Sequence, residues 1–385
     1  MIIVHLTNYF QPALGYQELF LAKEHKKLGH DVYVVTSDRY FPFPDYDKTV
    51  KSVLGDRIVG EKTEYLSGIK VIRLKTIFEY SARVKLAGLA KTLKEIKPDI
   101  VICHGISNFN ALEIIPLKKK LGFKLIYDEH MIKSVKNDRL SGKIFYKLFN
   151  FRKILKNSDK IVGVADTCVD FIVENYKFPR EKVTMIPLGA DTEIFKFDTG
   201  KRDNLRKKLN IPEDNAVVVY TGKLTFAKGP ANILHAADMI KESAKRKVTF
   251  LFVGNIEENY KDTFSSAKKK LENVFQIINI DAVKNEDLVE VYSASDVACW
   301  PRQSSMSMIE AASCSLPIIC CDFLTERYKN NNGIPVKEDD IEALSSALLK
   351  LVNNSQLRKT MGDNGRVYIE KSLSWKKIAS DFIRF

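Results

Sequence analysis

The chain has 385 residues, 45% of them hydrophobic and 28% charged, with a formal net charge of +13. This length exceeds what one hydrophobic core usually organises, so we expect two domains. The composition is that of a globular protein, and the lack of any apolar run of about 18 residues excludes a membrane-spanning helix. The start of the chain, MIIVHLTNYF, predicts a strand without the basic region of a signal peptide, so we expect a cytoplasmic protein.

The cysteines lie mostly inside apolar runs, without a CxxC pair and without histidines at zinc-ligand spacing. We therefore expect buried free thiols in a reducing compartment, and no metal site built from cysteine. The cysteines are Cys103, Cys168, Cys299, Cys314, Cys320 and Cys321.

The positive charge indicates an anionic partner, although its sign alone does not separate nucleic acid, membrane and phosphorylated substrate. Residues 131–160 contain nine Lys or Arg and two Asp, interleaved with bulky apolar residues such as Phe145, Leu148 and Phe151. This pattern is typical of a helix on an anionic membrane surface. It is equally typical of a core-facing helix with a solvated basic face, and the two alternatives stay open.

The first half of the chain alternates apolar runs with helix-length segments. Strands are predicted at 2–7 and 31–37, with a helix between them through LFLAKEHKKLG. Further strands are predicted at 71–74, 99–103, 124–127, 160–164 and 183–188. Continuous apolar strands separated by helices indicate a parallel sheet that is covered on both faces.

The second half repeats this scheme after a polar segment, 193–215, which is interrupted by Gly200 and Pro212 and has the character of a hinge. Its strands are predicted at 216–222, 248–254, 274–279, 297–300 and 317–321. The predicted fold class is α/β, with two doubly wound domains facing each other across a cleft. In such sheets, ligands bind beyond the carboxyl ends of the strands, where the winding reverses.

Small or charged residues follow several predicted strands. Gly15 comes just before a helix and would let the backbone approach a ligand, or would simply form a turn. In TGKLTFAKGP, residues 221–230, Lys223 and Lys228 could neutralise a diphosphate and stabilise it as a leaving group. Gly254 could admit a base or a ribose, and could equally only turn the chain.

His130 follows Asp128 and Glu129 at the end of a predicted strand. It could donate a hydrogen bond to a substrate hydroxyl or move a proton near neutral pH. A lone histidine is more often structural, and His5 and His104 also end strands.

The segment CWPRQSSMSMIEAAS, residues 299–313, passes from a buried strand through a polar loop into a helix that we expect to start around Ser305. A strand, small-residue loop and helix make a common anion site, because unpaired amides point at the ligand. Glu310 lies inside the helix, where its carboxylate could accept hydrogen bonds from two vicinal hydroxyls of a sugar.

Five segments, in this order, resemble those of retaining glycosyltransferases with the GT-B fold, in the large family 4 class. They are LGHDVYVVTS with the glycine loop before it, IPLGADTEIF, GKLTFAKG, YSASDVACWP and IEAASCSLPII. The resemblance covers nearly the whole chain, and five collinear segments are far more specific than one glycine loop.

The resemblance implies that a nucleotide diphosphate sugar lies between two Rossmann-like domains and mostly on the second. Lys223 and Lys228 would hold the diphosphate and the Ser305 and Met306 amides would meet it. Glu310 would bind the ribose, and His130 would lie close to the transferred sugar. The donor-binding set implied by the resemblance is Gly15, Gly222, Lys223, Lys228, Gly254, Arg302, Gln303, Ser304, Ser305, Met306 and Glu310, with His130, Lys228 and Lys223 as catalytic residues.

The chain departs from the family pattern at three positions. Lys223 replaces the usual arginine, which keeps the charge but loses the planar fork. Arg302 stands where the first glutamate of the Glu-x7-Glu pattern is expected, and Ser315 replaces a glycine after the helix. The missing glutamate leaves open an inactive module that binds nucleotide sugars; a sugar-nucleotide 2-epimerase and a nucleic-acid-binding protein are further, weaker alternatives.

We therefore expect a retaining hexosyltransferase that uses a nucleotide diphosphate sugar, a UDP-sugar by preference, and a saccharide or lipid-linked acceptor, as in surface polysaccharide synthesis. No metal and no cofactor are expected, and no nucleic-acid partner. An anionic membrane surface would be contacted through residues 131–160, at the cytoplasmic face. The expected domains are 1–195 for the acceptor and 196–365 for the nucleotide sugar, with a helix in 366–385 that crosses back to the first domain.

Overall fold

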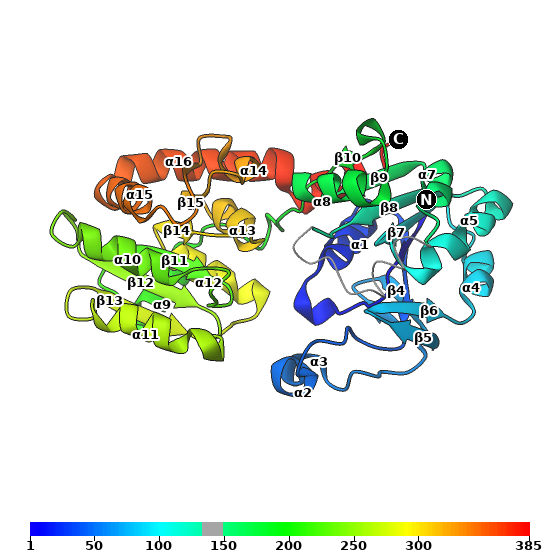
Figure 1. The fold of residues 1–385 in the computed structure, drawn as a ribbon, viewed down its shortest axis with the longest axis horizontal. Coiled ribbons are helices and arrows are strands. Elements are labelled where there is room, and N and C mark those ends of the chain that lie inside the picture. The colour runs from blue at the N-terminus through cyan, green and yellow to red at the C-terminus, as the bar shows by residue number, and fades with distance from the viewer. Residues whose placement is uncertain (133–148) are drawn as a thin grey trace. The chain divides into compact units, whose positions relative to one another are not determined.

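The computed structural model describes residues 1–132 and 149–385. Contacts divide the chain into two compact units (Figure 1), which we call the N-terminal unit, Met1–Leu188 with Trp375–Phe385, and the C-terminal unit, Gly189–Ser374. From the sequence the divisions were placed after residues 195 and 365. The structure divides the chain after Leu188 and after Ser374, and the carbonyl oxygen of Phe195 accepts from Ser313 at 2.6 Å and from Arg366 at 2.7 Å in the C-terminal unit.

Within its described residues, the N-terminal unit has an eight-stranded sheet in which neighbouring strands are parallel, except for one antiparallel edge pair. In spatial order the strands are β10 (Thr184–Met185), β9 (Lys160–Gly163), β8 (Lys124–Glu129), β7 (Ile100–His104), β1 (Ile2–Leu6), β2 (Asp31–Ser37), β4 (Ile69–Leu74) and β3 (Lys62–Leu66). A separate antiparallel pair is formed by β5 (Thr76–Tyr80) and β6 (Arg83–Leu86). The winding reverses between β1 and β7, so the loops after these strands border the place where such folds bind ligands.

Helices alternate with the strands of this unit. They are α1 (Gln17–Lys27), α2 (Tyr46–Thr49), α3 (Lys51–Leu54), α4 (Leu89–Ile96), α5 (Phe109–Leu121), α7 (Phe151–Asn157), α8 (Asp166–Phe171) and, from the end of the chain, α17 (Trp375–Phe382). Helix α17 packs on α1, where the rings of Phe20 and Trp375 stack with centroids 5.2 Å apart. The end of the chain thus returns to the unit in which the chain begins (Figure 1).

The C-terminal unit, all of whose residues are described, has a six-stranded parallel sheet. In spatial order the strands are β13 (Gln276–Ile280), β12 (Val248–Val253), β11 (Ala216–Thr221), β14 (Val297–Trp300), β15 (Ile318–Cys321) and β16 (Gly333–Val336). The helices are α9 (Thr199–Lys208), α10 (Ala231–Ile240), α11 (Lys261–Lys269), α12 (Leu288–Ala294), α13 (Ser307–Ser313), α14 (Thr325–Tyr328), α15 (Ile341–Asn353) and α16 (Ser355–Tyr368). Strands β11, β12 and β14 are buried throughout, as their apolar runs predict.

The basic segment 131–160 lies partly outside the described residues, because 133–148 are not described. In its described part, Phe151 and Ile154 of α7 are buried in the core of the N-terminal unit. For α7 the core-facing alternative is therefore correct, and a membrane contact by the rest of the segment stays a prediction. Among the helices in residues 1–132 and 149–385, none has the length and apolarity needed to span a bilayer.

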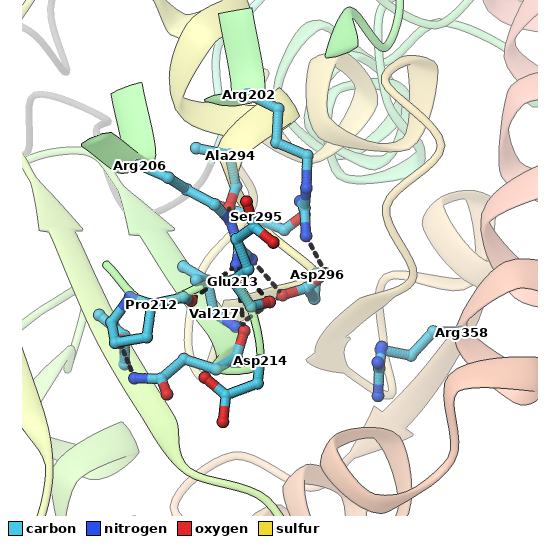
Figure 2. A network of polar contacts seen from close by, with 12 residues as sticks. Arg202, Arg206, Pro212, Glu213, Asp214, Val217, Ala294, Ser295, Asp296 and Arg358 are labelled. Carbon is cyan, nitrogen blue, oxygen red and sulfur yellow. Dashed lines mark hydrogen bonds and ion pairs between the residues drawn. The ribbon is translucent and has the colours of Figure 1, made fainter. Parts of the chain in front are cut away.

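A charged cluster lies at the amino ends of β11 and β14 in the C-terminal unit (Figure 2), whereas the predicted ligand loops follow the carboxyl ends of these strands. Asp296, just before β14, accepts from Arg202 at 3.0 Å and from Arg206 at 2.7 Å, and also accepts from the amide of Val217 at 2.8 Å. Arg206 donates further to the carbonyl oxygens of Ala294, Pro212, Glu213 and Asn215. This cluster fastens α9 to the amino ends of β11 and β14, so its charges have a structural role.

Replacing Arg206 by lysine is expected to lower the free energy of unfolding by about 1–2 kcal/mol, because an ammonium keeps the charge but cannot reach this many acceptors. Urea denaturation of the full chain measures the change. The matched control is Arg246→Lys, since Arg246 donates at an exposed position to the carbonyl oxygen of Asp214. Equal stability of the two variants would contradict the structural role of Arg206.

Candidate active site

The winding of the C-terminal sheet reverses between β11 and β14, and the loops after these two strands carry most of the predicted site residues. The loop after β11 holds Lys223 and Lys228, and the loop after β14 runs from Pro301 to Met306. The two loops are bonded to each other: Lys228 Nζ donates to the carbonyl oxygen of Ser304 at 3.1 Å. The structure therefore brings Lys228 together with the polar loop, and Lys223 lies at the start of the same lysine loop.

Lys228 is the more buried of the two lysines. Burial lowers the pKa of its ammonium group. Its recorded partner is a carbonyl oxygen, and within the described residues no carboxylate pairs with it. A partly desolvated cation without a carboxylate partner attracts an incoming anion more strongly than a fully solvated or paired cation does. Lys223 is exposed, and its own carbonyl oxygen accepts from the Tyr220 hydroxyl at 2.8 Å, which fixes the start of the loop.

Arg302 forms part of the loop framework. Its guanidinium pairs with Asp339 at 2.6 Å and donates to the carbonyl oxygen of Phe226 in the lysine loop. Gln303 and Ser304 are exposed, and Gln303 has a φ of 36°. The arginine at the position of the missing glutamate is thus directed to Asp339 and the backbone, while the next two residues stay accessible.

Helix α13 starts at Ser307, two residues later than the expected start around Ser305, with Met306 as its N-cap. The Ser305 hydroxyl accepts from the amide of Ser307 at 3.3 Å, which closes the turn before the helix. No acceptor in the described part of the chain is recorded for the amides of Ser305 and Met306. Both amides remain available to a ligand.

Glu310 is 4% exposed on α13. Its Oε1 accepts from the side-chain amide of Asn285 at 2.8 Å, and its Oε2 has no hydrogen-bond partner among the described residues. Desolvation raises the pKa of Glu310 to about 7, against the opposing effect of the hydrogen bond from Asn285 and of the nearby Tyr292 hydroxyl, which is itself 3.0 Å from Thr221 Oγ1. Burying a carboxylate oxygen without a hydrogen-bond donor costs free energy. A ligand that donates a hydrogen bond to this atom would therefore bind favourably.

Gly222 and Gly254 follow the neighbouring strands β11 and β12, with φ values of 135° and 144°. A Cβ on Gly254 would lie 2.1 Å from the carbonyl oxygen of Gly222. The close approach of these two backbone segments therefore requires glycine at 254 whether or not a ligand binds there. From the sequence, Gly254 could contact a base or ribose or could only turn the chain. The structure shows that backbone packing against Gly222 requires a glycine here in either case.

Gly15 and His130 belong to the N-terminal unit. Gly15 caps a short 3₁₀ turn with a φ of 65°, just before α1. His130 follows β8, its side chain is 44% exposed, and its Nε2 lies 3.9 Å from Asp128 Oδ2. Partial desolvation works against a charged ring, but the nearby carboxylates of Asp128, Glu18 and Glu129 outweigh it and raise the pKa of His130.

Asp128, two residues before His130, is a buried carboxylate at the end of β8. It is fully buried, and it accepts from the side chain of Gln17 at 3.3 Å, two residues after Gly15. The role of Asp128, like that of Asn285 beside Glu310, was not predicted. A carboxylate at the end of a buried strand was the visible signal for Asp128, whereas Asn285 sits in a polar loop without a distinguishing pattern.

Comparison with known proteins places both units in glycosyltransferase families. A model described as Glycosyl transferases group 1 matches residues 201–368, and one described as Glycosyltransferase Family 4 matches residues 19–194. The chain is similar to an uncharacterized glycosyltransferase of Methanocaldococcus jannaschii, with 25% identity over 69% of this chain and 67% of that protein. It is 23% identical to the capsular polysaccharide biosynthesis glycosyltransferase CapM of Staphylococcus aureus, over 66% of this chain and 70% of that protein.

A D-inositol 3-phosphate glycosyltransferase of Stackebrandtia nassauensis is 23% identical over 69% of this chain and 63% of its own length. Among solved structures, Anabaena HepE in complex with UDP matches with a TM-score of 0.70 and 15% identity, over 99% of this chain and 98% of that one. Sucrose-phosphate synthase from Thermosynechococcus elongatus matches with a TM-score of 0.68 and 18% identity, over 99% and 96%. These structures have the GT-B fold, which confirms the predicted fold of two Rossmann-like domains.

Proposed function

The chain belongs to the group 1, family 4 glycosyltransferases, and we propose that it moves a hexosyl residue, N-acetylhexosaminyl included, from a nucleotide diphosphate sugar to a saccharide acceptor with retention. The observation that carries this proposal is the buried Oε2 of Glu310, which lacks a donor in a unit that also presents the ammonium group of Lys228. Vicinal ribose hydroxyls would supply two donors to the carboxylate, and a diphosphate would pair with the lysine.

The proposed donor is a UDP-sugar. Support comes from the structures of HepE in complex with UDP and with UDP-glucose, which match this chain with TM-scores of 0.70 and 0.65. In the proposed arrangement Lys223, Lys228 and the amides of Ser305 and Met306 hold the diphosphate. Gln303 or Ser304 then contacts the transferred sugar, because Arg302 has no oxygen acceptor and is bonded to Asp339.

The proposed reaction breaks the bond between the anomeric carbon and the diphosphate and forms one to an acceptor hydroxyl on the same face. The hydroxyl proton passes to the leaving phosphate oxygen. Charge develops on that diphosphate, where Lys228 and Lys223 stabilise it without reorganisation. His130 would position the sugar by donating a hydrogen bond to one of its hydroxyls.

The acceptor class is a saccharide or a lipid-linked saccharide, as in surface polysaccharide or glycoconjugate synthesis. The similarity to CapM supports this class. With a lipid-linked acceptor the protein would work at the cytoplasmic face of a membrane, in keeping with its net charge of +13.

Retention predicts the anomer of the product. When a UDP-α-sugar is the donor, the sugar released by slow hydrolysis is expected to emerge as the α-anomer, because attack and departure share one face. Proton NMR recorded before mutarotation distinguishes the anomers, with Lys228→Ala protein as the blank. First appearance of the β-anomer would rule out retention.

We further propose that the lysines and backbone amides replace a bound cation at the diphosphate. Turnover is therefore expected to stay within about twofold when EDTA is added, since two ammonium groups already balance the leaving-group charge. The assay measures nucleotide release with and without EDTA. A loss of turnover that Mg²⁺ restores would contradict this part of the proposal.

A second candidate function, a module that binds nucleotide sugars without turnover, rests on Arg302. The family glutamate at this position is absent, and the arginine is held by Asp339 and Phe226. Binding of a UDP-sugar without nucleotide release, in the presence of saccharide acceptors, would favour this second candidate.

A further inference from the structure

Asp128 is the last member of a chain of buried side chains in the N-terminal unit. Its Oδ2 lies 2.7 Å from His104 Nδ1, and His104 Nε2 lies 3.0 Å from His5 Nδ1. His5 Nε2 lies 3.1 Å from His25 Nδ1, and His25 Nε2 lies 2.9 Å from the carbonyl oxygen of Ala379 on α17. His5, His25 and Asp128 are 0% exposed and His104 is 9% exposed, so water cannot substitute for these partners.

The hydrogen bonds between these buried side chains need one proton more than three neutral imidazole rings supply. There are four hydrogen bonds, and each needs one proton between its two heavy atoms. A neutral imidazole carries a single N–H, so three neutral rings furnish three protons. The carbonyl oxygen of Ala379 can only accept, and so can an ionised Asp128. A fourth proton is therefore required, and with it the three rings and the carboxylate are together electrically neutral.

The surroundings indicate where the fourth proton resides. Desolvation, together with neighbouring histidine rings, lowers the pKa of His5 and brings that of His25 to about 4, so both rings are neutral. Asp128 also accepts from the amide of Gly105 at 3.1 Å and from the side chain of Gln17 at 3.3 Å, so both of its oxygens act as acceptors and the proton between Asp128 and His104 is assigned to the ring. His5 and His25 then each carry their proton on Nε2, and the ring between His5 and Asp128 carries two.

Other titratable groups face this chain from the elements packed around it. They are Glu18 on α1, His30 after α1, Cys103 on β7, and Glu129 and His130 at the end of β8. Glu129 is itself held by the Tyr176 hydroxyl at 2.6 Å and by the amides of His130 and Met131. The Asp128 oxygen that accepts from His104 lies 3.9 Å from His130 Nε2, so the charge of Asp128 acts on both rings.

We propose that the fourth proton resides on His104, which fixes the Asp128 carboxylate, and that the negative charge of Asp128, 3.9 Å from His130 Nε2, orients the His130 ring, which makes His104 a positioning residue. The catalytic part of this inference rests on the proposed function, whereas the proton count does not. The row of hydrogen-bonded histidines ends at the carbonyl oxygen of Ala379 on α17. Docking of this helix therefore supplies the acceptor that selects the Nε2–H tautomer of His25. This tautomer in turn fixes the direction of each hydrogen bond as far as Asp128.

NMR of the full chain with ¹⁵N-labelled histidine tests the proton count without any donor or acceptor. Among the rings of His5, His25 and His104 at neutral pH, we expect both nitrogens of His104 to be protonated and His5 and His25 to be in the neutral Nε2–H form. Single substitutions assign each signal and separate it from that of His130, whose pKa is also raised. Asp128→Asn is expected to abolish the doubly protonated signal of His104, because the asparagine amide can donate to His104 Nδ1 and the fourth proton is no longer needed. Neutral forms of all three rings in the unmodified protein would overturn the proposal, and this outcome does not depend on the variant folding.

Kinetics test the positioning role. His104→Gln is expected to lower kcat by about 10- to 100-fold with KM for the donor unchanged, since a displacement of about 1 Å at a catalytic group costs this much. The control is His235→Gln on α10, an exposed histidine of the other unit. Unchanged kcat in His104→Gln would refute the positioning role. If the unmodified protein shows no transfer at all while the NMR pattern is as expected, the proposed function fails and the proton count stands.

Discussion

Replacing Lys228 by alanine is expected to lower kcat by about 100- to 1,000-fold, the usual consequence of removing one group that stabilises a developing negative charge. The ammonium is partly buried, and its recorded partner is the Ser304 carbonyl rather than a carboxylate. Its full charge is therefore available to the leaving diphosphate. Nucleotide release under saturating donor measures the effect.

The control for this variant is Lys241→Ala, at the far end of the helix that follows the lysine loop, where Lys241 pairs with Asp238 at 2.9 Å. Thermal unfolding of both variants shows whether the fold is kept. Undiminished turnover in Lys228→Ala would refute the assignment of this loop to the diphosphate.

Replacing Glu310 by glutamine is expected to weaken binding of the nucleotide by about 10- to 100-fold, because hydrogen bonds to a charged acceptor contribute about 1.5–3 kcal/mol. The carboxylate would accept from two ribose hydroxyls, one at the Oε2 that has no partner among the described residues. Titration calorimetry with UDP measures the change. The control is Glu290→Gln, an exposed glutamate on α12.

The same residue predicts a pH dependence. Burial raises the pKa of Glu310 to about 7, and the carboxylate is the form that accepts both hydroxyls. Affinity for UDP should therefore rise from about pH 6 to about pH 8, and Glu310→Gln should flatten the profile. A profile that is the same in both proteins would contradict the role of Glu310.

The free energy of unfolding should depend on pH in the opposite direction to the affinity for UDP. Because the pKa of Glu310 is higher in the folded chain than its ordinary value of 4.5, the folded state binds more protons between these two pKa values. The contribution of Glu310 to the free energy of unfolding therefore falls as the pH rises from about 4.5 to about 7. Binding affinity and stability should thus change in opposite directions over the upper part of this range.

The buried parallel strands could be predicted because each is a short continuous apolar run between helices. Strands β3, β5, β6 and β16 were not predicted, and for β3 and β16 the reason is visible in the sequence. Strand β3, KTEYL, is a polar edge strand whose antiparallel pairing with β4 depends on a turn at Ser67 and Gly68, both with positive φ. Strand β16, GIPV, contains a proline that weakens any strand pattern.

The part of the candidate site that lies in loops at the carboxyl ends of strands could be predicted from the sequence. Lys228, Ser304 and Glu310 follow from the rule that ligands bind beyond the carboxyl ends of strands. The partners that give these residues their chemistry could not be predicted, because they depend on which distant segments meet. Asn285 reaches Glu310 from the loop before α12, and the chain from His25 to Asp128 requires the register of β1 beside β7 and the docking of α17.

The central claim, transfer from a nucleotide diphosphate sugar, is tested most directly by thermal shift and nucleotide release over a panel of UDP-, GDP- and ADP-sugars. We predict that sugars of one nucleotide, UDP by preference, raise the unfolding temperature and are slowly turned over, and that Lys228→Ala loses the turnover. A flat response to every member of the panel, identical in the unmodified protein and in the variant, would contradict the account.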